Sequence, residues 1–251
     1  MTEKIALVTG GAKRIGRSIV EQLAASGWSV CIHCNRSREG ADALAQTIRD
    51  SGGSAAVIQG DLSDIRAVRT LIPQTVELLG APNLLVNNAS LFEQDEIDTL
   101  SEASWSIHMN ANLQAPVFLA HDFATHLPED REGLIVNIID QRVWKLTPQF
   151  FSYTLAKSGL WTATQTMAQG LAPRIRVNGI GPGPTIMNAR QETSDFQQQI
   201  DATILGHGAD LKEFGATIRY LWENRSITGQ MIALDGGQHL IWQTADVSVV
   251  E

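Results

Sequence analysis

Short runs of apolar residues alternate with amphipathic stretches along the whole chain. Each run is apolar at nearly every position, which is typical of a strand buried on both faces of a parallel sheet. We expect such strands at Ile5–Val8, Val30–His33, Ala55–Gln59, Leu84–Asn87, Leu134–Ile138, Arg176–Ile180 and Met231–Leu234. The stretches between them have helical periodicity. They predict helices at Ile15–Ser26, Glu39–Ser51, Ile65–Leu79, Glu102–His126, Ser152–Ala172 and Ala209–Trp222.

Strict alternation of strand and helix predicts an α/β fold, a doubly wound parallel sheet with helices on both faces. No linker, repeat or low-complexity tract interrupts the pattern, so residues 1–251 are expected to form a single domain. The one long irregular stretch is 181–208. Because long loops in compact domains are usually functional, we expect residues 184–208 to form a substrate lid.

The composition excludes several classes of protein. The chain has 251 residues, of which 18% are charged, and a formal net charge of −8. A net-negative chain is a poor binder of nucleic acid, and no apolar run approaches the roughly 20 residues needed to cross a bilayer. With a strand expected as early as Ile5, the N-terminus leaves no room for a signal peptide, so we expect a cytoplasmic protein.

Cys31 and Cys34 form a C-x-x-C pair, a spacing that elsewhere binds zinc or performs redox chemistry. Here the pair lies in an expected strand, where side chains three positions apart point to opposite faces. We therefore expect one buried thiol and one half-exposed thiol, with neither a disulfide nor a metal site.

The first expected strand ends in the turn Thr9-Gly10-Gly11-Ala12-Lys13-Arg14-Ile15-Gly16, which opens a helix. Small residues let the backbone approach a pyrophosphate, and a helix N-terminus stabilises its charge. The position of the turn favours a dinucleotide site formed by Gly10, Arg14, Ile15 and Gly16, although glycines also serve ordinary strand-to-helix turns.

The end of the second strand distinguishes NAD from NADP. NAD sites place Asp or Glu about 20 residues beyond the glycine turn, where it accepts the ribose 2′-hydroxyl. In this chain the segment is Asn35-Arg36-Ser37, without an acid. Arg36 and Ser37 are suited to a 2′-phosphate, and Arg14 can reach the same region. The sequence therefore predicts NADP(H), the alternative being a solvated arginine in a loop.

Tyr153 and Lys157 are four residues apart, so they share one face of an expected helix. An ammonium beside a phenol is expected to lower the pKa of the tyrosine from about 10, which lets it exchange a proton near neutral pH. Taken alone, such a pair is usually a surface feature.

The motifs together resemble the short-chain dehydrogenase/reductase family over nearly the whole chain. In the order of that family they are the glycine turn, Asp61-Leu62, Asn87-Asn88-Ala89-Ser90, Asn112, Tyr153 with Lys157, Asn178-Gly179-Ile180-Gly181-Pro182-Gly183 and Asp235-Gly236-Gly237. The resemblance implies a Rossmann-like sheet of seven strands, hydride transfer from a nicotinamide, and usually a homotetramer.

The same resemblance assigns roles to residues. It implies an Asn–Ser–Tyr–Lys catalytic group, in which Asn112 matches the asparagine, Tyr153 the proton donor, and Lys157 the lysine that orients the ribose. It further places Asp61 and Leu62 beside the adenine, and Pro182 and Gly183 beside the nicotinamide. The backbone of Asn88, Ala89 and Ser90 would line the cofactor.

Two departures from the family pattern are informative. The catalytic serine of the family stands thirteen residues before the tyrosine, and here that position is Asp140. The usual N-N-A-G is N-N-A-S, followed by Leu91 and Phe92. An ionised Asp140 would repel the developing alkoxide of a ketone, whereas a carboxylate suits a substrate that presents N–H donors. Each of the two residues also has a plain alternative, Asp140 as a polar strand end and Phe92 as a packing aromatic.

These departures, with Arg14, His33 and Asn35-Arg36-Ser37, are similar to those of pteridine reductases and dihydromonapterin reductases. The resemblance implies reduction of a pterin C=N bond by NADPH, with Phe92 stacked on the pterin and Asp140 with Tyr153 at the ring nitrogens. Two alternatives stay open. One is a carbonyl or 3-oxoacyl reductase, which Asp140 disfavours. The other is a non-catalytic NADP(H)-binding regulator, which the retained Asn112, Tyr153 and Lys157 disfavour. The segment 141–144 matches no assigned pattern.

Overall fold

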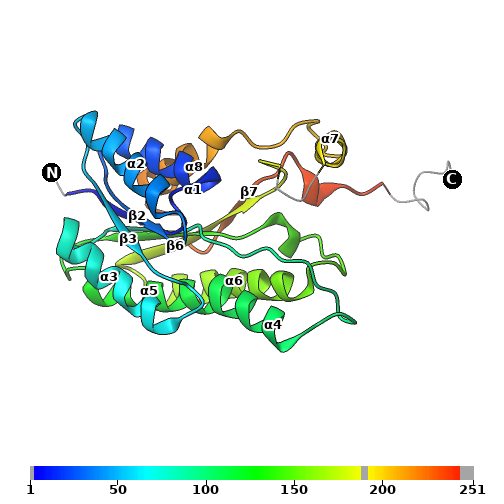
Figure 1. The fold of residues 1–251 in the computed structure, drawn as a ribbon, viewed down its shortest axis with the longest axis horizontal. Helices are drawn as coiled ribbons and strands as arrows, with labels where there is room; N and C mark the ends of the chain where they lie inside the picture. Colours follow the sequence, from blue (N-terminus) through cyan, green and yellow to red (C-terminus); the bar gives the residue numbers. More distant parts are fainter. Residues whose placement is uncertain (1–2, 188–191, 244–251) are drawn as a thin grey trace.

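Seven parallel strands form one sheet in the order β3-β2-β1-β4-β5-β6-β7 (Figure 1). The computed structural model describes residues 3–187 and 192–243. The strands are β1 (Ile5–Val8), β2 (Ser29–Cys34), β3 (Ala55–Gln59), β4 (Leu84–Asn87), β5 (Gly133–Ile138), β6 (Ile175–Pro182) and β7 (Met231–Leu234). Each expected strand is present within two residues of its predicted ends, and the expected doubly wound fold is confirmed.

Helices cover both faces of the sheet (Figure 1). On one face are α1 (Arg14–Ala25), α2 (Arg38–Asp50) and α8 (Leu211–Glu223). On the other are α3 (Ile65–Leu79), α4 (Glu102–Met109), α5 (Ala115–His126) and α6 (Phe151–Gly170). The alternation of strand side chains divides the core accordingly. Ala6 and Val8 belong to the cluster under α1, α2 and α8, whereas Leu7 packs with α3 and α5.

The helix expected over 102–126 is divided in the structure. A π-helical turn, Asn110–Gln114, joins α4 to α5, and the N–H of Ala115 donates to the carbonyl of Asn110 five residues back. Pro116 follows in the first turn of α5. Because proline has no N–H, the carbonyl of Asn112 has no α-helical partner at this point. Such π-turns occur mostly at functional sites, and this one contains Asn112.

The stretch expected to be irregular contains a helix that the sequence pattern did not reveal. β6 continues to Pro182, and α7 spans Thr193–Asp201 within the proposed lid. α7 buries none of its residues, so it lacks the apolar stripe by which a helix is recognised in a sequence. Part of the proposed lid, residues 188–191 with Arg190, lies outside the described residues.

Cys31 and Cys34 point to opposite faces of β2, as expected. Cys31 belongs to the core cluster under α3 and α5, and Cys34 to the cluster under α1, α2 and α8. The expectation that one thiol is half-exposed was wrong, since both side chains are buried. The reason is that α2 covers the end of β2. Across residues 3–187 and 192–243, no helix is long and apolar enough to cross a membrane.

Candidate active site

The glycine turn lies at the carboxyl end of β1, where the order of the strands reverses. Crevices at such a point are the usual ligand sites of open α/β sheets. The N–H of Gly10 donates to Nδ1 of His33 over 3.2 Å, and the N–H of Gly11 donates to the carbonyl of His33 over 3.0 Å. His33 is buried, which lowers its pKa to about 4. It is therefore neutral and joins the turn to the end of β2.

Asn88, the residue directly after β4, holds the glycine turn in place by hydrogen bonds. Its Nδ2 donates to the carbonyls of Thr9 and Gly10 over 2.8 and 3.2 Å, and the N–H groups of Asn88 and Ala89 donate to Oγ1 of Thr9, each over 3.0 Å. A Cβ at Gly16 would collide with the carbonyl oxygen of Gly10. Because Gly16 has no side chain, it can approach Gly10 closely, and the N-terminus of α1 stays open toward the crevice. An open helix N-terminus of this kind can bind a pyrophosphate.

Arg14 has a left-handed backbone, with φ +53°. It stands where the family has its middle glycine, and an L-residue in this region costs about 1–2 kcal/mol. Its guanidinium donates to the carbonyls of Ile186 and Met187 over 2.8 and 3.0 Å. Arg14 thus contacts the segment after β6, and it borders the same cavity as Arg36.

The polar segment after β2 lies beside the glycine turn, as predicted. Asn35, Arg36 and Ser37 all border the same cavity as Gly10 and Gly16. Asp61 faces this segment, since its pKa is held below the usual value first by hydrogen bonds from Ser63 and then by Asn35 and the charge of Arg36.

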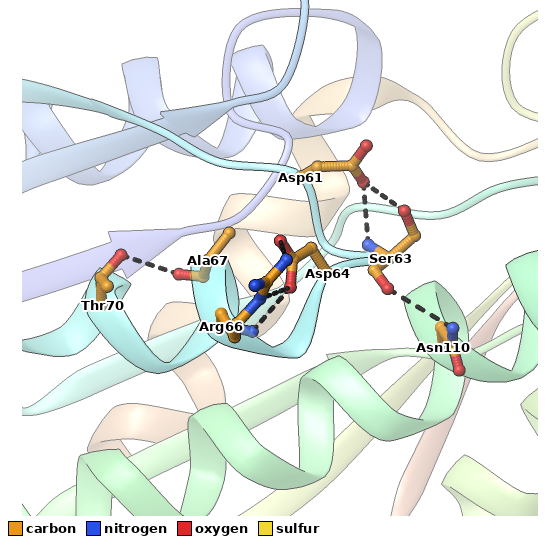
Figure 2. Close-up of polar contacts among 7 residues, drawn as sticks. All are labelled: Asp61, Ser63, Asp64, Arg66, Ala67, Thr70 and Asn110. Carbon is orange, nitrogen blue, oxygen red and sulfur yellow. Dashed lines mark hydrogen bonds and ion pairs between the residues drawn. The ribbon is translucent and has the colours of Figure 1, made fainter.

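Figure 2 shows the carboxylate of Asp61 accepting hydrogen bonds from the N–H and hydroxyl of Ser63, while Asn110 donates to the carbonyl of Ser63. The π-helical turn thus supports the loop that carries Asp61. Leu62 is buried with the core under α3 and α5, and neither Asp61 nor Leu62 borders the cavity.

Tyr153, Asp140 and Lys157 form one cluster at the carboxyl end of β5. The hydroxyl of Tyr153 donates to Oδ2 of Asp140 over 2.8 Å, and Oδ1 of Asp140 accepts from the N–H of Arg142 over 2.8 Å. Nζ of Lys157 donates to the carbonyl of Ile138 over 2.8 Å and lies 5.7 Å from the centre of the Tyr153 ring. The structure thus brings together three residues that the sequence predicted for the same site.

The expectation that the pKa of Tyr153 is lowered was wrong. Burial and the neighbouring Asp140 raise the pKa of Tyr153 well above 10. Burial also raises the pKa of Asp140, against the hydrogen bonds from Arg142 and Tyr153, and it lowers the pKa of Lys157 to about 8. The spacing of Tyr153 and Lys157 shows only the lysine, whereas burial of the phenol has the largest effect on its pKa and the adjacent carboxylate adds to it. Tyr153 is therefore a protonated donor near neutral pH.

Asn112 acts on the loop after β4. It is fully buried, its Oδ1 accepts from the N–H of Leu91 over 2.9 Å and from the hydroxyl of Ser90 over 3.2 Å, and its Nδ2 donates to the carbonyl of Leu91 over 2.8 Å. No hydrogen bond between its side chain and Asp140, Tyr153 or Lys157 is present in the part of the chain that the structure describes. Its contacts hold Ser90 and Leu91 in place beside the cavity.

Phe92 contacts Tyr153 directly. Its ring meets the ring of Tyr153 edge-on, with centroids 4.7 Å apart, and stacks on Phe150 with centroids 4.1 Å apart. The guanidinium of Arg142 lies 5.2 Å from the centre of the Phe150 ring. Phe150 was missed by the sequence analysis. It has φ +57°, and nothing in the local sequence signals a left-handed phenylalanine.

These residues enclose one cavity of about 580 Å³. Its walls hold most of the residues expected from the sequence: Gly10, Arg14, Ile15, Gly16, Asn35, Arg36, Ser37, Asn88, Ala89, Ser90, Phe92, Asp140, Tyr153, Lys157, Pro182 and Gly183. Gln141, Arg142, Phe196, Gln199 and Gln238 also border it, and these come from segments without a recognised pattern. Within the described parts of the chain, no group of His, Cys, Asp and Glu residues is arranged to hold a metal ion.

The family model "short chain dehydrogenase" matches residues 4–198. The chain belongs to this family, as the glycine turn and the Tyr153–Lys157 pair indicated. Among curated relatives, it is 29% identical to the 3-oxoacyl-[acyl-carrier-protein] reductase FabG of Staphylococcus aureus, over 94% of this chain and 98% of that protein.

Solved structures give a closer likeness. The FolM alternative dihydrofolate reductase 1 of Brucella suis, in complex with NADP, is 58% identical with a TM-score of 0.95, covering 97% of this chain and 98% of that one. The corresponding protein of Brucella canis, also complexed with NADP, is 56% identical with a TM-score of 0.93, covering 98% of each chain. These likenesses support the pteridine reductase-like branch expected from the sequence.

Proposed function

We propose that this protein is an NADPH-dependent oxidoreductase that reduces a ring C=N bond of a pterin, of the dihydropterin-to-tetrahydropterin type. The hydrogen bond between the hydroxyl of Tyr153 and the carboxyl of Asp140 is the observation on which the proposal chiefly rests. The FolM enzymes named above, alternative dihydrofolate reductases solved with NADP, support both the activity and the cofactor.

The site fits NADP(H). The close approach of Gly16 to Gly10 leaves room for a pyrophosphate at the start of α1, and an added Cβ would remove that room. The 2′-phosphate would be held by Arg36 and Ser37, where an NAD site would have an acid. The nicotinamide end would lie against Pro182 and Gly183, with Tyr153 and Lys157 close to its ribose. When bound, the cofactor supplies the hydride.

The chain itself supplies the proton and the recognition of nitrogen. A C=N carbon accepts a hydride readily only when its nitrogen gains a proton. Tyr153 is protonated near neutral pH, and the raised pKa of Asp140 lets that carboxyl retain a proton more readily than a solvated aspartate. In its ionised form Asp140 accepts hydrogen bonds from the amino and ring N–H groups of a pterin. Phe92 supplies an apolar ring beside the same pair.

A 3-oxoacyl reductase is the second candidate, favoured by the likeness to FabG over 94% of the chain. Asp140 argues against it, because a carboxylate at the position of the family serine opposes the negative charge that develops on a ketone oxygen. A non-catalytic NADP(H)-binding regulator is less well supported, since it needs no buried Asp140–Tyr153–Lys157 cluster. A homotetramer and a cytoplasmic location remain predictions from the sequence and the family resemblance.

A panel assay distinguishes the three functions. The protein is mixed with NADPH and, in separate reactions, a dihydropterin, a diketone, a 3-oxoacyl thioester or no substrate, and NADPH oxidation is followed. The proposal expects rapid oxidation with the dihydropterin and loss of that activity in Tyr153→Phe. Rapid turnover of the thioester without turnover of the dihydropterin would replace the proposal with the second candidate. NADPH binding without turnover of any substrate would indicate the regulator.

A further inference from the structure

The loop between β4 and α4, residues 88–101, presents Phe92 to the candidate active site. Hydrogen bonds hold this loop at three of its residues. Leu91 is held by Asn112, as described above. The N–H of Glu93 donates to Nε2 of His108 over 3.1 Å. The third residue is Asp95, which is buried although the residues on either side of it are more exposed.

Asp95 accepts hydrogen bonds from two helices, α6 and α4. Its Oδ1 accepts from the N–H of Ser152 over 3.1 Å, and its main-chain carbonyl accepts from the N–H of Phe151 over 3.0 Å. Its Oδ2 accepts from the hydroxyl of Ser104 in α4 over 2.7 Å. Burial alone would raise the pKa of Asp95, but the hydrogen bonds from Ser152 and Ser104 outweigh it, so the side chain is ionised.

The start of α6 depends on this contact. The first N–H groups of a helix have no partner within the helix, and they are normally capped by the residue before it. That residue is Phe150, whose side chain has no group that could cap and makes no such hydrogen bond. Asp95 therefore supplies from another segment the cap that the sequence around α6 lacks. Tyr153 is the next residue after the two that Asp95 binds.

The same contact determines where Phe92 stands relative to Tyr153. Phe92 is three residues before Asp95, and Phe150 immediately precedes the two residues that Asp95 binds. The ring of Phe92 is in direct contact with the rings of Phe150 and Tyr153. A shift of the loop along α6 would thus change the gap between Phe92 and the Tyr153 hydroxyl. Asp95 itself is not part of the cavity wall.

We propose that Asp95 is a positioning residue, which sets the separation between Phe92 and the hydroxyl of Tyr153 and so aligns the substrate with its proton donor. This inference rests on the proposed function for the identity of the substrate, and on the hydrogen bonds of Asp95 for the mechanism. A displacement of about 1 Å at a reacting centre can cost about 100-fold in rate.

The test compares Asp95→Ala and Asp95→Asn with Asp98→Ala, a control that removes an exposed carboxylate from the same loop. For Asp95→Ala we expect kcat/KM for a dihydropterin to fall by between about tenfold and 100-fold, with the Kd of NADPH unchanged. Asp95→Asn keeps an oxygen for the N–H of Ser152, so it should retain more activity. Asp98→Ala should behave as wild type. An equal loss of NADPH affinity in Asp95→Ala would overturn the proposal.

A double-mutant cycle with Phe92→Leu separates positioning from general destabilisation. If Asp95 acts through Phe92, Asp95→Ala should cost less than about threefold once Phe92 is replaced, because coupled residues are not additive. The same fold-loss in both backgrounds would overturn the inference. Ser104→Ala, which removes only the link to α4, serves if Asp95→Ala does not fold, and the same non-additivity is then expected.

Failure of the proposed function has a different signature. In that case wild type does not reduce the dihydropterin, and the variants are compared on whichever substrate of the panel is turned over. Hydrogen exchange needs no substrate at all. The amides of Phe151 and Ser152 should exchange faster in Asp95→Ala than in wild type or Asp98→Ala. Unchanged exchange at both amides would overturn the role of Asp95, whatever the substrate.

Discussion

The hydroxyl of Tyr153 donates a hydrogen bond to Oδ2 of Asp140 over 2.8 Å, in the wall of the cavity that the glycine turn borders. Burial is the main influence on the protonation of both groups, and the contact adds to it for Tyr153 and opposes it for Asp140. Burial disfavours two charges here, so the pKa values of the phenol and of the carboxyl are both raised. The pair therefore retains a proton near neutral pH, which the proposed function uses at a substrate nitrogen.

Replacing Tyr153 by phenylalanine should separate binding from turnover. The ring still fills its place against Phe92, but the proton donor is gone. We expect kcat for the dihydropterin to fall by about 10²–10⁴-fold, the usual contribution of a positioned acid. The Kd of NADPH, measured by fluorescence titration, should remain close to that of wild type. A rate within a few-fold of wild type would show that another group donates the proton.

Cofactor choice should depend on Arg36. The change Arg36→Asp converts an attraction for the 2′-phosphate into a repulsion, and we expect it to weaken NADPH binding by at least about 2 kcal/mol. NADH binding should change far less. The control is Arg219→Asp, the same change on an exposed residue of α8 that does not border the cavity. Equal dissociation constants of wild type for NADPH and NADH would contradict the assignment of Arg36.

The left-handed backbone of Arg14 predicts an unusual order of stabilities. Arg14→Ala and Arg14→Gly both remove the hydrogen bonds to Ile186 and Met187, but only glycine relieves the strain of φ +53°. We expect Arg14→Gly to be more stable than Arg14→Ala by about 1 kcal/mol. Urea denaturation of the cofactor-free variants measures the difference. If the alanine variant is the more stable one, the strain at this position is absent.

Lys157 should make the stability of the protein rise with pH. Burial lowers its pKa to about 8 from the usual 10.5, so between these pH values the unfolded chain binds more protons than the folded one. Stability then increases with pH in that window. Relative to Lys157→Met, the free energy of unfolding of wild type should rise by about 2 kcal/mol from pH 7 to pH 9.5. A parallel pH dependence of the two proteins would mean that Lys157 titrates normally.

Sequence patterns predicted the sheet because its strands are short runs that are apolar at nearly every position, as in Ile5–Val8 and Leu84–Asn87. They located Tyr153 and Lys157 for a similar reason, since the two residues are neighbours on one helix. They did not reveal α7, which buries no residue, or the division of the helix at Asn112. α7 has no buried apolar face for a pattern to reveal, and the division of the helix follows from a backbone partner that Pro116 cannot provide.

The parts of the site that sequence reasoning missed come from residues far apart in the chain. The spacing of Tyr153 and Lys157 suggests a lowered pKa for the tyrosine, but burial, with the neighbouring Asp140, raises that pKa instead. Phe150 and Asp95 carry no motif. Phe150 becomes recognisable only through its stack on Phe92, and Asp95 only through its hydrogen bonds to α6 and α4. The preference of a residue for helix, strand or turn reveals neither a ring stack nor a hydrogen bond between residues far apart in the chain.

The substitution Asp140→Ser, assayed on two substrates, decides whether Asp140 directs the enzyme toward a pterin. Serine restores the family residue beside Tyr153, which suits a ketone oxygen, but it removes the carboxyl that suits a pterin. With kcat/KM measured for one dihydropterin and one diketone in both proteins, the account predicts a sharp fall for the dihydropterin, unchanged NADPH binding, and equal or higher activity on the diketone. An equal loss on both substrates, or a wild-type protein that reduces the diketone efficiently and the dihydropterin not at all, would contradict it.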